Sequence, residues 1–292
     1  MRKPMKHFDP EPAPGNFGKR IPGLNLSEPQ APEVFKALFS ILYEHRFLVI
    51  PGQDLTLDQY LQFGESFGTP IPHVVDQTRM EGHPEIQAVH NIRKEKKKYT
   101  DGAAWWHTDQ SYEAQPAITT MLYSVQAPKK GGETRIADMI AAYEALSAEM
   151  KTRIADLEVE HLYGKGVALQ KDDIPTPPLS EAQSKRVPPV IHKLVRPHPV
   201  TGQKTLYSPA GTSQGIQGLV LAEAKTLLNE LATHALQPRF QNKHQYAVGD
   251  VVLWDTAATM HAASPNHAAT GPDDTRFLYR ISVRGIPPLL QA

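Results

Sequence analysis

Four stretches of the chain carry apolar residues at the three- and four-residue spacing of an amphipathic helix. The first, PEVFKALFSILYEH (32–45), runs directly into FLVI, a short apolar strand ended by Pro51. A second helix is expected from Thr56, because T-L-D-Q offers a capping box. The other two are expected over residues 138–157 and 220–236. Such apolar stripes are typical of core packing rather than of function.

Short extended runs with turn residues lie between and after these helices. They are TTMLYSV (119–125), a hairpin around Thr201 and Gly202, VGDVVLWDT (248–256) and TRFLYRISVRG (275–285). Short strands without repeated strand–helix–strand units favour a mainly β fold with flanking helices, an antiparallel barrel or jelly roll. No repeat or change of composition marks a boundary, so residues 1–292 are expected to form a single domain.

Three segments have the composition of irregular structure. Residues 1–30 are rich in proline and glycine and are expected to wrap over the domain. The polar, proline-rich stretch 171–189 indicates a long surface insertion, and residues 164–190 could form a lid or a plain loop. The basic run 92–102 is typical of a solvated surface.

Composition narrows the function. The chain has 31 basic and 31 acidic residues, which gives no overall field for polyanions, so we expect a small-molecule ligand and no nucleic acid. The absence of cysteine excludes disulfides, iron–sulfur clusters and thiolate metal sites, so a metal must be held by nitrogen and oxygen. No signal peptide and no stretch of roughly 20 apolar residues is found, which predicts a cytoplasmic protein without a membrane partner.

The segment WWHTDQSY holds the first candidate chemistry. If it is extended, His107 and Asp109 point to the same face and converge on one spot that could hold a metal ion. Of the H-x-[DE] matches in the chain, only this one follows an aromatic pair. The alternative is a half-buried histidine that a neighbouring carboxylate orients.

A third ligand is offered by VVLWDTAATMHAAS, where a buried-looking strand leads to His261. Strands far apart in sequence are neighbours in a jelly roll, so His261 can complete the site of His107 and Asp109. Two imidazoles and one carboxylate leave coordination positions open, as in the non-haem Fe(II) oxygenases, and a catalytic zinc could use similar ligands. The ligand set alone does not distinguish the two metals.

The strand TRFLYRISVRG places Arg276, Arg280 and Arg284 on one face and apolar residues on the other. It could be an edge strand whose arginines lie in water. A strand that follows a metal ligand in a barrel could instead line the cavity, where a guanidinium binds a carboxylate through two hydrogen bonds.

Together, WHTD, GGETRIAD, LWDTAATMH and TRFLYR resemble the TauD/TfdA family of Fe(II)- and 2-oxoglutarate-dependent dioxygenases, and the resemblance runs from FLVIPGQ at residue 47 to Arg284. It implies a double-stranded β-helix (jelly-roll) core. It also implies that His107, Asp109 and His261 are the iron ligands.

The resemblance further implies how the cosubstrate binds. The family's threonine follows the acidic ligand by 25 positions, which corresponds to Thr134, and with Arg276 it would hold the distal carboxylate of 2-oxoglutarate. Arg280 would lie nearer the metal and the substrate. The loop from His261 to Arg276 is longer than is usual in the family, so Arg280 remains an alternative anchor for 2-oxoglutarate, and we favour Arg276.

The implied reaction consumes 2-oxoglutarate and O2 and yields succinate, CO2 and a hydroxylated substrate. Related halogenases have a small residue at the position of Asp109, so the carboxylate predicts hydroxylation. Trp105, Trp106 and Trp254 are expected to form an apolar wall beside the site.

The candidate substrate-binding residues are His73, Arg280, Gln110 and Ala103. His73 falls where taurine dioxygenases have a sulfonate-binding histidine, and with Arg280 it could clamp an anion. Those enzymes have a tyrosine and an asparagine where this chain has Asp76 and Ala103, which argues against taurine itself. We therefore expect a small anionic organic substrate: another sulfonate, a sulfate ester or an aryloxyalkanoate.

Two other functions fit part of the pattern. A zinc-dependent hydrolase would use the same three ligands but leaves Arg276 and Thr134 without a role. A jelly-roll protein that binds an anion without catalysis would form no succinate. A homo-oligomer is implied by the resemblance alone.

Overall fold

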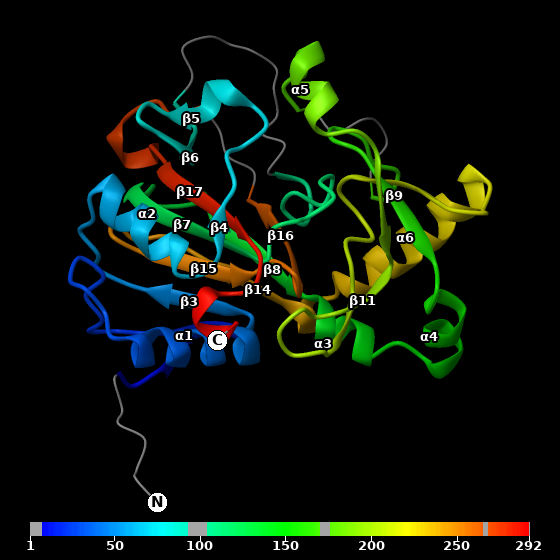
Figure 1. Ribbon diagram of the computed structural model, residues 1–292, viewed down its shortest axis with the longest axis horizontal. Helices are drawn as coiled ribbons and strands as arrows, with labels where there is room; N and C mark the ends of the chain where they lie inside the picture. The colour runs from blue at the N-terminus through cyan, green and yellow to red at the C-terminus, as the bar shows by residue number, and fades with distance from the viewer. Residues whose placement is uncertain (1–7, 93–103, 170–175, 265–267, 292) are drawn as a thin grey trace, which may run out of the picture.

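Two facing β-sheets and a helical flank make up the computed structural model, which describes residues 8–92, 104–169, 176–264 and 268–291 (Figure 1). The large sheet has the order β1-β2-β3-β15-β7-β17-β6-β5, with β4 added beside β17, and the small sheet has the order β14-β8-β16. All of these pairings are antiparallel except that of β2 with β3. The fold is therefore a jelly roll with flanking helices, as the sequence predicts.

The strands of the large sheet are β1 (Glu11–Pro12), β2 (Lys19–Arg20), β3 (Phe47–Ile50), β4 (Thr69–Pro70), β5 (Arg79–Met80), β6 (His83–His90), β7 (Thr119–Gln126), β15 (Val251–Asp255) and β17 (Phe277–Arg284). Those of the small sheet are β8 (Thr134–Asp138), β14 (Gln241–His244) and β16 (Thr259–Ala263). A third sheet contains β9 (Glu158–His161), β10 (Val190–Lys193) and β13 (Ser213–Ile216), and a hairpin joins β11 (Val195–Pro197) to β12 (Lys204–Leu206).

The helices are α1 (Pro32–His45), α2 (Leu57–Glu65), α3 (Met139–Glu144), α4 (Ala148–Ile154), α5 (Glu181–Arg186) and α6 (Leu221–Ala235). Single 3-10 turns occur at η1 (Asp76–Thr78), η3 (Pro238–Phe240), η4 (Pro272–Asp274) and η5 (Pro288–Leu290). The capping box expected at Thr56 is present, with Gln59 as its partner.

The predicted helix over 138–157 is wrong as one element, because it is divided into α3 and α4. Asp138 caps α3 by accepting hydrogen bonds from two backbone N–H groups of the first turn. Ser147 then starts α4, since its side chain accepts a hydrogen bond from the N–H of Met150. A residue that satisfies free N–H groups at a helix start is poorly suited to a helix interior, so Ser147 divides the stretch.

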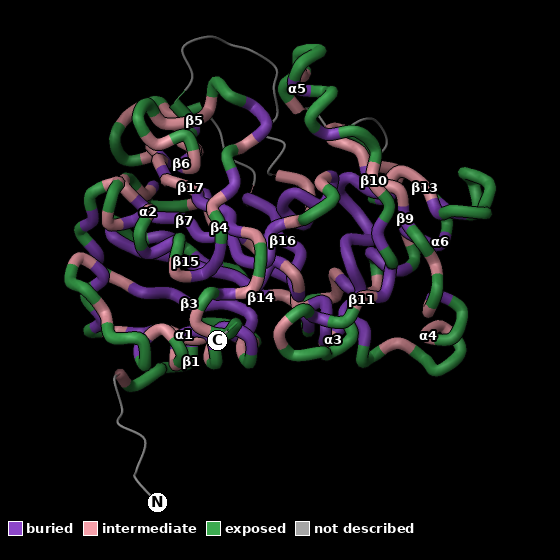
Figure 2. Tube along the Cα trace, viewed as in Figure 1, coloured by how far each residue is buried: buried purple, intermediate pink, exposed green. Residues whose placement is uncertain are grey.

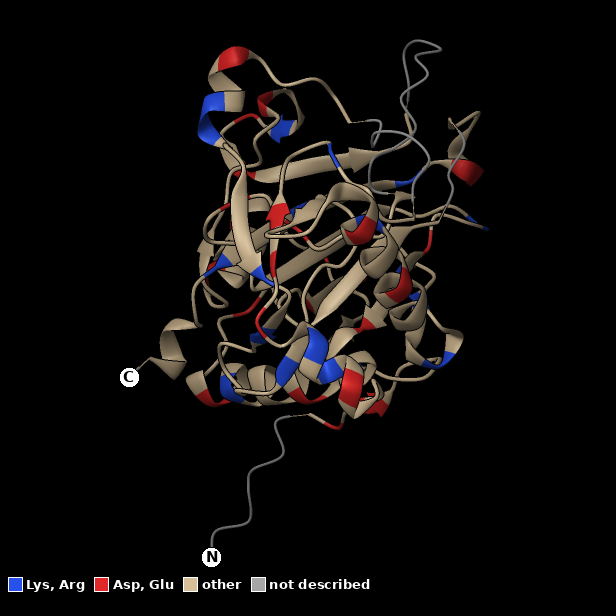
Figure 3. Ribbon diagram, turned by 90° about the vertical axis from the view of Figure 1, so that its right-hand side faces the viewer, with Lys and Arg blue, Asp and Glu red and all other residues tan. Residues whose placement is uncertain are grey.

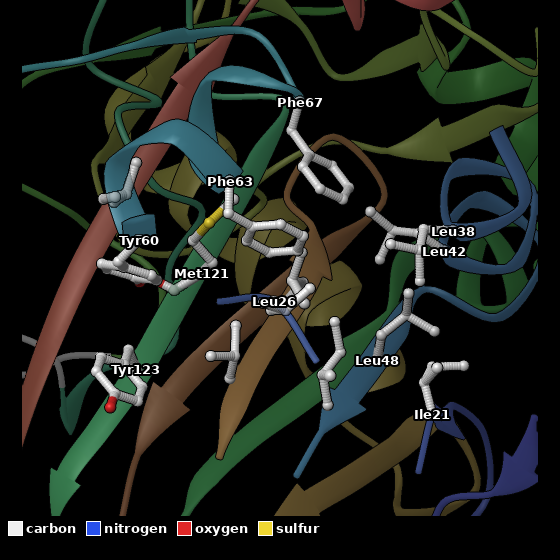
Figure 4. Close-up of a cluster of buried hydrophobic side chains, with 14 of the residues drawn as sticks. Ile21, Leu26, Leu38, Leu42, Leu48, Tyr60, Phe63, Phe67, Met121 and Tyr123 are labelled. Atoms are coloured by element: carbon white, nitrogen blue, oxygen red, sulfur yellow. The ribbon is translucent and has the colours of Figure 1, made fainter. Parts of the chain in front are cut away.

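The apolar core lies between and outside the sheets. The inner faces meet around Leu122, Trp254 and Leu278 of the large sheet and Ile136 of the small sheet, all of them buried. The outer face is covered by α1 and α2 (Figure 4). The central strands β3, β15 and β16 are buried along their whole length (Figure 2).

A second core cluster joins α3 and α6 to the third sheet and to β12. It contains Leu206 of β12, Val159 of β9 and the apolar stripe of α6, for which Leu227, Leu228 and Leu231 are almost completely buried. This cluster builds the right-hand side of the molecule in Figure 1.

Strand β17 lies inside the large sheet, since β7 pairs with one of its edges and β6 with the other. The interpretation of TRFLYRISVRG as an edge strand is therefore wrong. Leu278 faces the barrel interior, and the alternation along a strand sends Arg276 and Arg280 to that same face.

Residues 8–30 are irregular apart from β1 and β2, as expected. Much of the basic run 92–102 and residues 170–175 of the insertion lie outside the described residues, but the insertion includes α5. Lys and Arg alternate with Asp and Glu over the view in Figure 3, in keeping with the balanced charge. Within the described part of the chain, no helix combines the length and apolarity needed to cross a bilayer.

Candidate metal centre

Three side chains from separate parts of the barrel converge on one point. One ligand atom from each of His107, Asp109 and His261 lies within 4.8 Å of the others. His107 belongs to a single bridge beside β16: its N–H donates to the carbonyl of His261 at 2.9 Å, and the N–H of His261 donates to the carbonyl of His107 at 2.8 Å. The backbone pairing therefore fixes the two imidazoles side by side, with ring centroids 4.2 Å apart.

The hydrogen bonds of His107 orient its imidazole toward the point of convergence. Nδ1 lies 2.7 Å from the carbonyl oxygen of Trp105. Because a carbonyl only accepts, Nδ1 must carry the proton, which leaves the lone pair on Nε2. Nε2 lies 3.6 Å from Oδ1 of Asp109, so the free lone pair faces the carboxylate.

His261 is buried among aromatic rings and offers a neutral imidazole. Trp254 packs against it at a centroid distance of 4.6 Å, which confirms one part of the expected tryptophan wall. Burial lowers the pKa of His261 to about 3, so the ring carries no charge at neutral pH. Its Nε2 lies 3.6 Å from Oδ2 of Asp109. Trp106 instead contacts Arg135, whose guanidinium lies 5.0 Å from the indole centroid.

Asp109 is 4% exposed and has two differently occupied oxygens. Oδ1 accepts a hydrogen bond of 2.6 Å from Arg280, whereas Oδ2 is buried without a hydrogen-bond partner. Burial opposes ionisation, but the charge of Arg280 and the two neighbouring imidazoles outweigh it and hold the pKa of Asp109 well below its usual range. An ionised, buried oxygen without a donor, next to two imidazole nitrogens, fits a metal cation.

The donor set restricts which cation fits. Two imidazoles and one carboxylate suit the borderline divalent metals, and the same 2-His-1-carboxylate set is used by non-haem Fe(II) oxygenases. In the structure, His107 forms an isolated β-bridge and the chain turns at Asp109. The carboxylate thus reaches the histidines by a turn rather than by the simple alternation that we expected.

A second set of polar residues comes from the residue before β17, the start of β8 and the segment after β14. The Arg276 side chain is buried, and its Nε donates to the carbonyl of Gly132 at 2.9 Å. Its guanidinium carbon lies 5.4 Å from the ring centroid of Tyr246, and the hydroxyl of Tyr246 is 2.8 Å from the hydroxyl of Thr134. Tyr246 therefore connects the two residues that the resemblance assigns to 2-oxoglutarate.

Sequence reasoning missed Tyr246, which follows β14. That strand pairs with β8 so that His244 opposes Thr134. This pairing joins segments more than 100 residues apart, and no local pattern in QYAVGD predicts it. The partner of Arg280 was missed for the same reason: Gln87, on β6, accepts a hydrogen bond of 2.7 Å from the guanidinium.

The two arginines thus occupy different places. Arg276 lies beside Thr134 and Tyr246, whereas Arg280 lies on the metal-ligand candidate Asp109. This arrangement favours Arg276 as the cosubstrate anchor and leaves Arg280 next to the point of convergence.

The predicted substrate residues are only partly brought together. His73 is half-buried; burial, followed by the charge of Arg280, lowers its pKa to about 3. Its Nδ1 accepts a hydrogen bond from the N–H of Val75, so Nε2 carries the proton and can donate. Gln110 is 3% exposed, has a left-handed backbone (φ 49°) and a buried Oε1 without a partner. Ala103 lies outside the described residues.

A jelly roll that gathers two histidines and a carboxylate has the architecture of the non-haem metal oxygenases. The profile of the family described as "Taurine catabolism dioxygenase TauD, TfdA family" matches residues 9–282. The chain therefore belongs to the TauD/TfdA family, whose members are oxidoreductases that depend on 2-oxoglutarate.

Individual relatives agree with this assignment. The alpha-ketoglutarate-dependent 2,4-dichlorophenoxyacetate dioxygenase of Cupriavidus pinatubonensis is 31% identical over 84% of this chain and 88% of its own length. An alpha-ketoglutarate-dependent sulfate ester dioxygenase of Pseudomonas putida is 28% identical over 97% of this chain and 91% of its own. The crystal structure of AAD-2 in complex with Mn(II) and N-oxalylglycine superposes with a TM-score of 0.79 at 27% identity and covers 97% of this chain and 99% of that one.

Proposed function

We propose that the protein is an Fe(II)- and 2-oxoglutarate-dependent dioxygenase that hydroxylates a small anionic organic substrate. His107, Asp109 and His261 are its metal ligands. The observation that carries this proposal is the convergence of two imidazoles with a buried carboxylate, one oxygen of which has no hydrogen-bond donor. Fe(II) with 2-oxoglutarate supplies the activation of O2 and yields succinate and CO2.

Arg276 and Thr134 bind the distal carboxylate of 2-oxoglutarate in this proposal. A buried guanidinium needs an anion to offset its lost hydration, and its planar fork matches a carboxylate. Only its Nε is used by the Gly132 carbonyl. Support also comes from Tyr246, whose hydroxyl contacts the Thr134 hydroxyl and whose ring contacts the Arg276 guanidinium.

His73 and Arg280 select the anionic group of the substrate. The Arg280 charge acts on both His73 and Asp109, so the two candidates lie in one electrostatic neighbourhood at the metal centre. The neutral His73 offers a donor at Nε2, and Arg280 offers positive charge. Hydroxylation beside a heteroatom would cleave an aryloxyalkanoate or a sulfate ester, which are the substrate types in the names of the two relatives.

Taurine itself is disfavoured. Asp76 stands where taurine dioxygenases have a tyrosine, and its carboxylate is engaged by Arg79 at 2.6 Å and Arg186 at 3.2 Å. A carboxylate would also repel a sulfonate instead of donating to it. The family match favours the dioxygenase over the zinc hydrolase and over non-catalytic anion binding. The cytoplasmic location and a homo-oligomer stay predictions.

The test is a succinate assay with Fe(II), 2-oxoglutarate and O2 over a panel of aryloxyalkanoates, sulfate esters and sulfonates, with neutral and cationic analogues of similar size. We expect succinate release that only anionic compounds stimulate. His261→Gln should abolish it, because one ligand is lost. His83→Gln is the matched control, since His83 is an imidazole on the surface that pairs with Asp58.

Two results would contradict the proposal. Turnover with Zn(II) and no need for 2-oxoglutarate would identify a hydrolase. Stimulation by neutral or cationic compounds alone would remove the role of His73 and Arg280 as an anion clamp while leaving the dioxygenase class intact.

A further inference from the structure

The turn that begins at Asp109 is attached to the third sheet by a chain of buried side-chain hydrogen bonds. Ser111, two residues after Asp109, has its Oγ 2.7 Å from Oγ1 of Thr212. That same Oγ1 lies 3.0 Å from Nδ1 of His161, the last residue of β9. All three side chains are at least 90% buried, so water does not substitute for these bonds.

A second attachment holds the end of the same turn. Nε2 of His192, on β10, lies 3.0 Å from the carbonyl oxygen of Glu113. The ring of His192 packs 5.4 Å from that of His161, so both attachments come from neighbouring strands of the third sheet. The turn between Asp109 and Glu113 is therefore tied at two points to a sheet that supplies none of the metal-ligand candidates.

The loop that contains Thr212 also touches the backbone of His107. Gly211 has a left-handed backbone (φ 81°), and a Cβ built on it would lie 2.8 Å from Cβ of His107 and 3.0 Å from its Cα. Such a contact is too close for any side chain. The carbonyl of Thr212 accepts a hydrogen bond from the N–H of Leu162, which fixes the loop to the end of β9.

We propose that Thr212, with Gly211, is a positioning residue for the metal centre: the Ser111–Thr212–His161 chain holds the turn so that His107 and Asp109 face His261 before a metal arrives. The inference rests on the proposed function, because it needs these three residues to be the ligands. It follows from a general property of metal sites, that hydrogen-bonded residues behind the ligands set ligand orientation and typically change affinity by roughly ten- to a hundredfold.

The test measures metal binding without turnover. Mn(II) is added to the metal-free protein, and the disappearance of the electron paramagnetic resonance signal of free Mn(II) gives the dissociation constant. We expect the wild type to bind one Mn(II) per chain and Thr212→Val to bind it about tenfold more weakly, because Val keeps the shape but loses the hydroxyl. Thr212→Ser should restore the affinity.

A control separates positioning from loss of stability. Thr56→Ala removes the capping box of α2, far along the chain from the metal candidates, and should lower the unfolding midpoint without changing Mn(II) affinity. Gly211→Ala provides a second probe, since the added methyl group presses on His107; a folded variant should show weakened Mn(II) binding.

The outcomes distinguish the two proposals. If the wild type binds Mn(II) and Thr212→Val binds it equally well, the positioning role is overturned and the metal site remains. If Thr212→Val and Thr56→Ala lose affinity in proportion to their lost stability, Thr212 is only structural. If the wild type itself binds no Mn(II), the proposed metal centre fails and the inference fails with it.

Discussion

Two arginines at one edge of the site show how position along the chain assigns different roles to the same residue type. Arg276 directly precedes β17 and Arg280 lies on it, four residues further on, so about 13 Å of extended backbone separates them. Arg276 meets Tyr246 and Thr134, whereas Arg280 meets Asp109 and Gln87. The two positions suit two different anions: Arg276 a carboxylate of 2-oxoglutarate, and Arg280 the anionic group of the substrate.

Substitution of Arg276 should therefore affect 2-oxoglutarate and spare the metal. Arg276→Lys keeps the charge but loses the planar fork, and we expect KM for 2-oxoglutarate to rise about tenfold or more, with Mn(II) affinity unchanged. Tyr246→Phe should raise that KM by a smaller factor, because it removes only the hydroxyl that contacts Thr134. Steady-state succinate kinetics measure both.

Arg239→Lys is the matched control for this pair. Arg239 also lies over an aromatic ring, with its guanidinium 4.6 Å from the centroid of Phe240, but it is exposed. A rise in KM of the same size for Arg239→Lys, or no rise for Arg276→Lys, would argue against the proposed anchor.

The periodicity of apolar residues correctly predicted the position of most helices and strands, because local sequence largely determines where these elements form. The helices α1, α2 and α6 and the strands β3, β7, β15 and β17 lie where the pattern placed them. The division of 138–157 was missed, because the apolar period continues through Ser147 while its capping bond begins a new helix. The inner position of β17 was left open, because a strand's neighbours are chosen by pairing across the sheet.

Helix α5 belongs to segment 164–190, for which the sequence left a lid or a plain loop open, and its contacts reach the neighbourhood of His73. Arg186 donates to the carbonyl of Val74, and Gln183 and Arg186 both contact the carboxylate of Asp76. Val187, which is 6% exposed, packs with Val74, Val75 and Tyr112. Because exposed ion pairs contribute little, the apolar contact should dominate the attachment.

We expect Val187→Asp to release α5, since it buries a charge among apolar side chains. Hydrogen–deuterium exchange across 176–190 should become faster, and KM for an anionic substrate should rise severalfold. Lys185→Ala is the control, because Lys185 is exposed and pairs with Glu181 on the same helix. Unchanged exchange in Val187→Asp would show that α5 does not depend on this contact.

The buried imidazole of His161 makes the stability of the whole protein depend on pH. Burial lowers the pKa of His161 to about 3, so the folded protein keeps this ring neutral over most of the acid range. The unfolded chain protonates it near pH 6.5. Below that pH the unfolded state binds more protons, so the free energy of unfolding must fall as the pH falls.

The wild type should therefore lose about 2 kcal/mol from His161 between pH 7 and pH 5, at about 1.4 kcal/mol per pH unit below pH 6.5. The difference in urea unfolding free energy between wild type and His161→Gln measures this contribution. For His83→Gln, the corresponding difference in unfolding free energy should depend on pH in the opposite direction, because the hydrogen bond with Asp58 raises the pKa of His83. A pH-independent difference for His161→Gln would contradict the buried neutral ring.

The candidate site was predictable in its residues and only partly in its geometry. The motifs around His107, Asp109 and His261 sufficed to name the three converging side chains, because two imidazoles and a carboxylate form the donor set of a divalent metal site. Tyr246 and Thr212 could not be named, since each reaches the site through pairing or a loop contact far from any motif.

The hydrogen bond from Arg280 to Asp109 also determines how many coordination positions of a metal ion at this centre would remain for small molecules. The Arg280 guanidinium donates a hydrogen bond to Oδ1 of Asp109, so only Oδ2 is left for a cation. With the two histidine nitrogens, the protein would supply three ligand atoms to a divalent cation. The other coordination positions of that cation would remain available to 2-oxoglutarate and dioxygen.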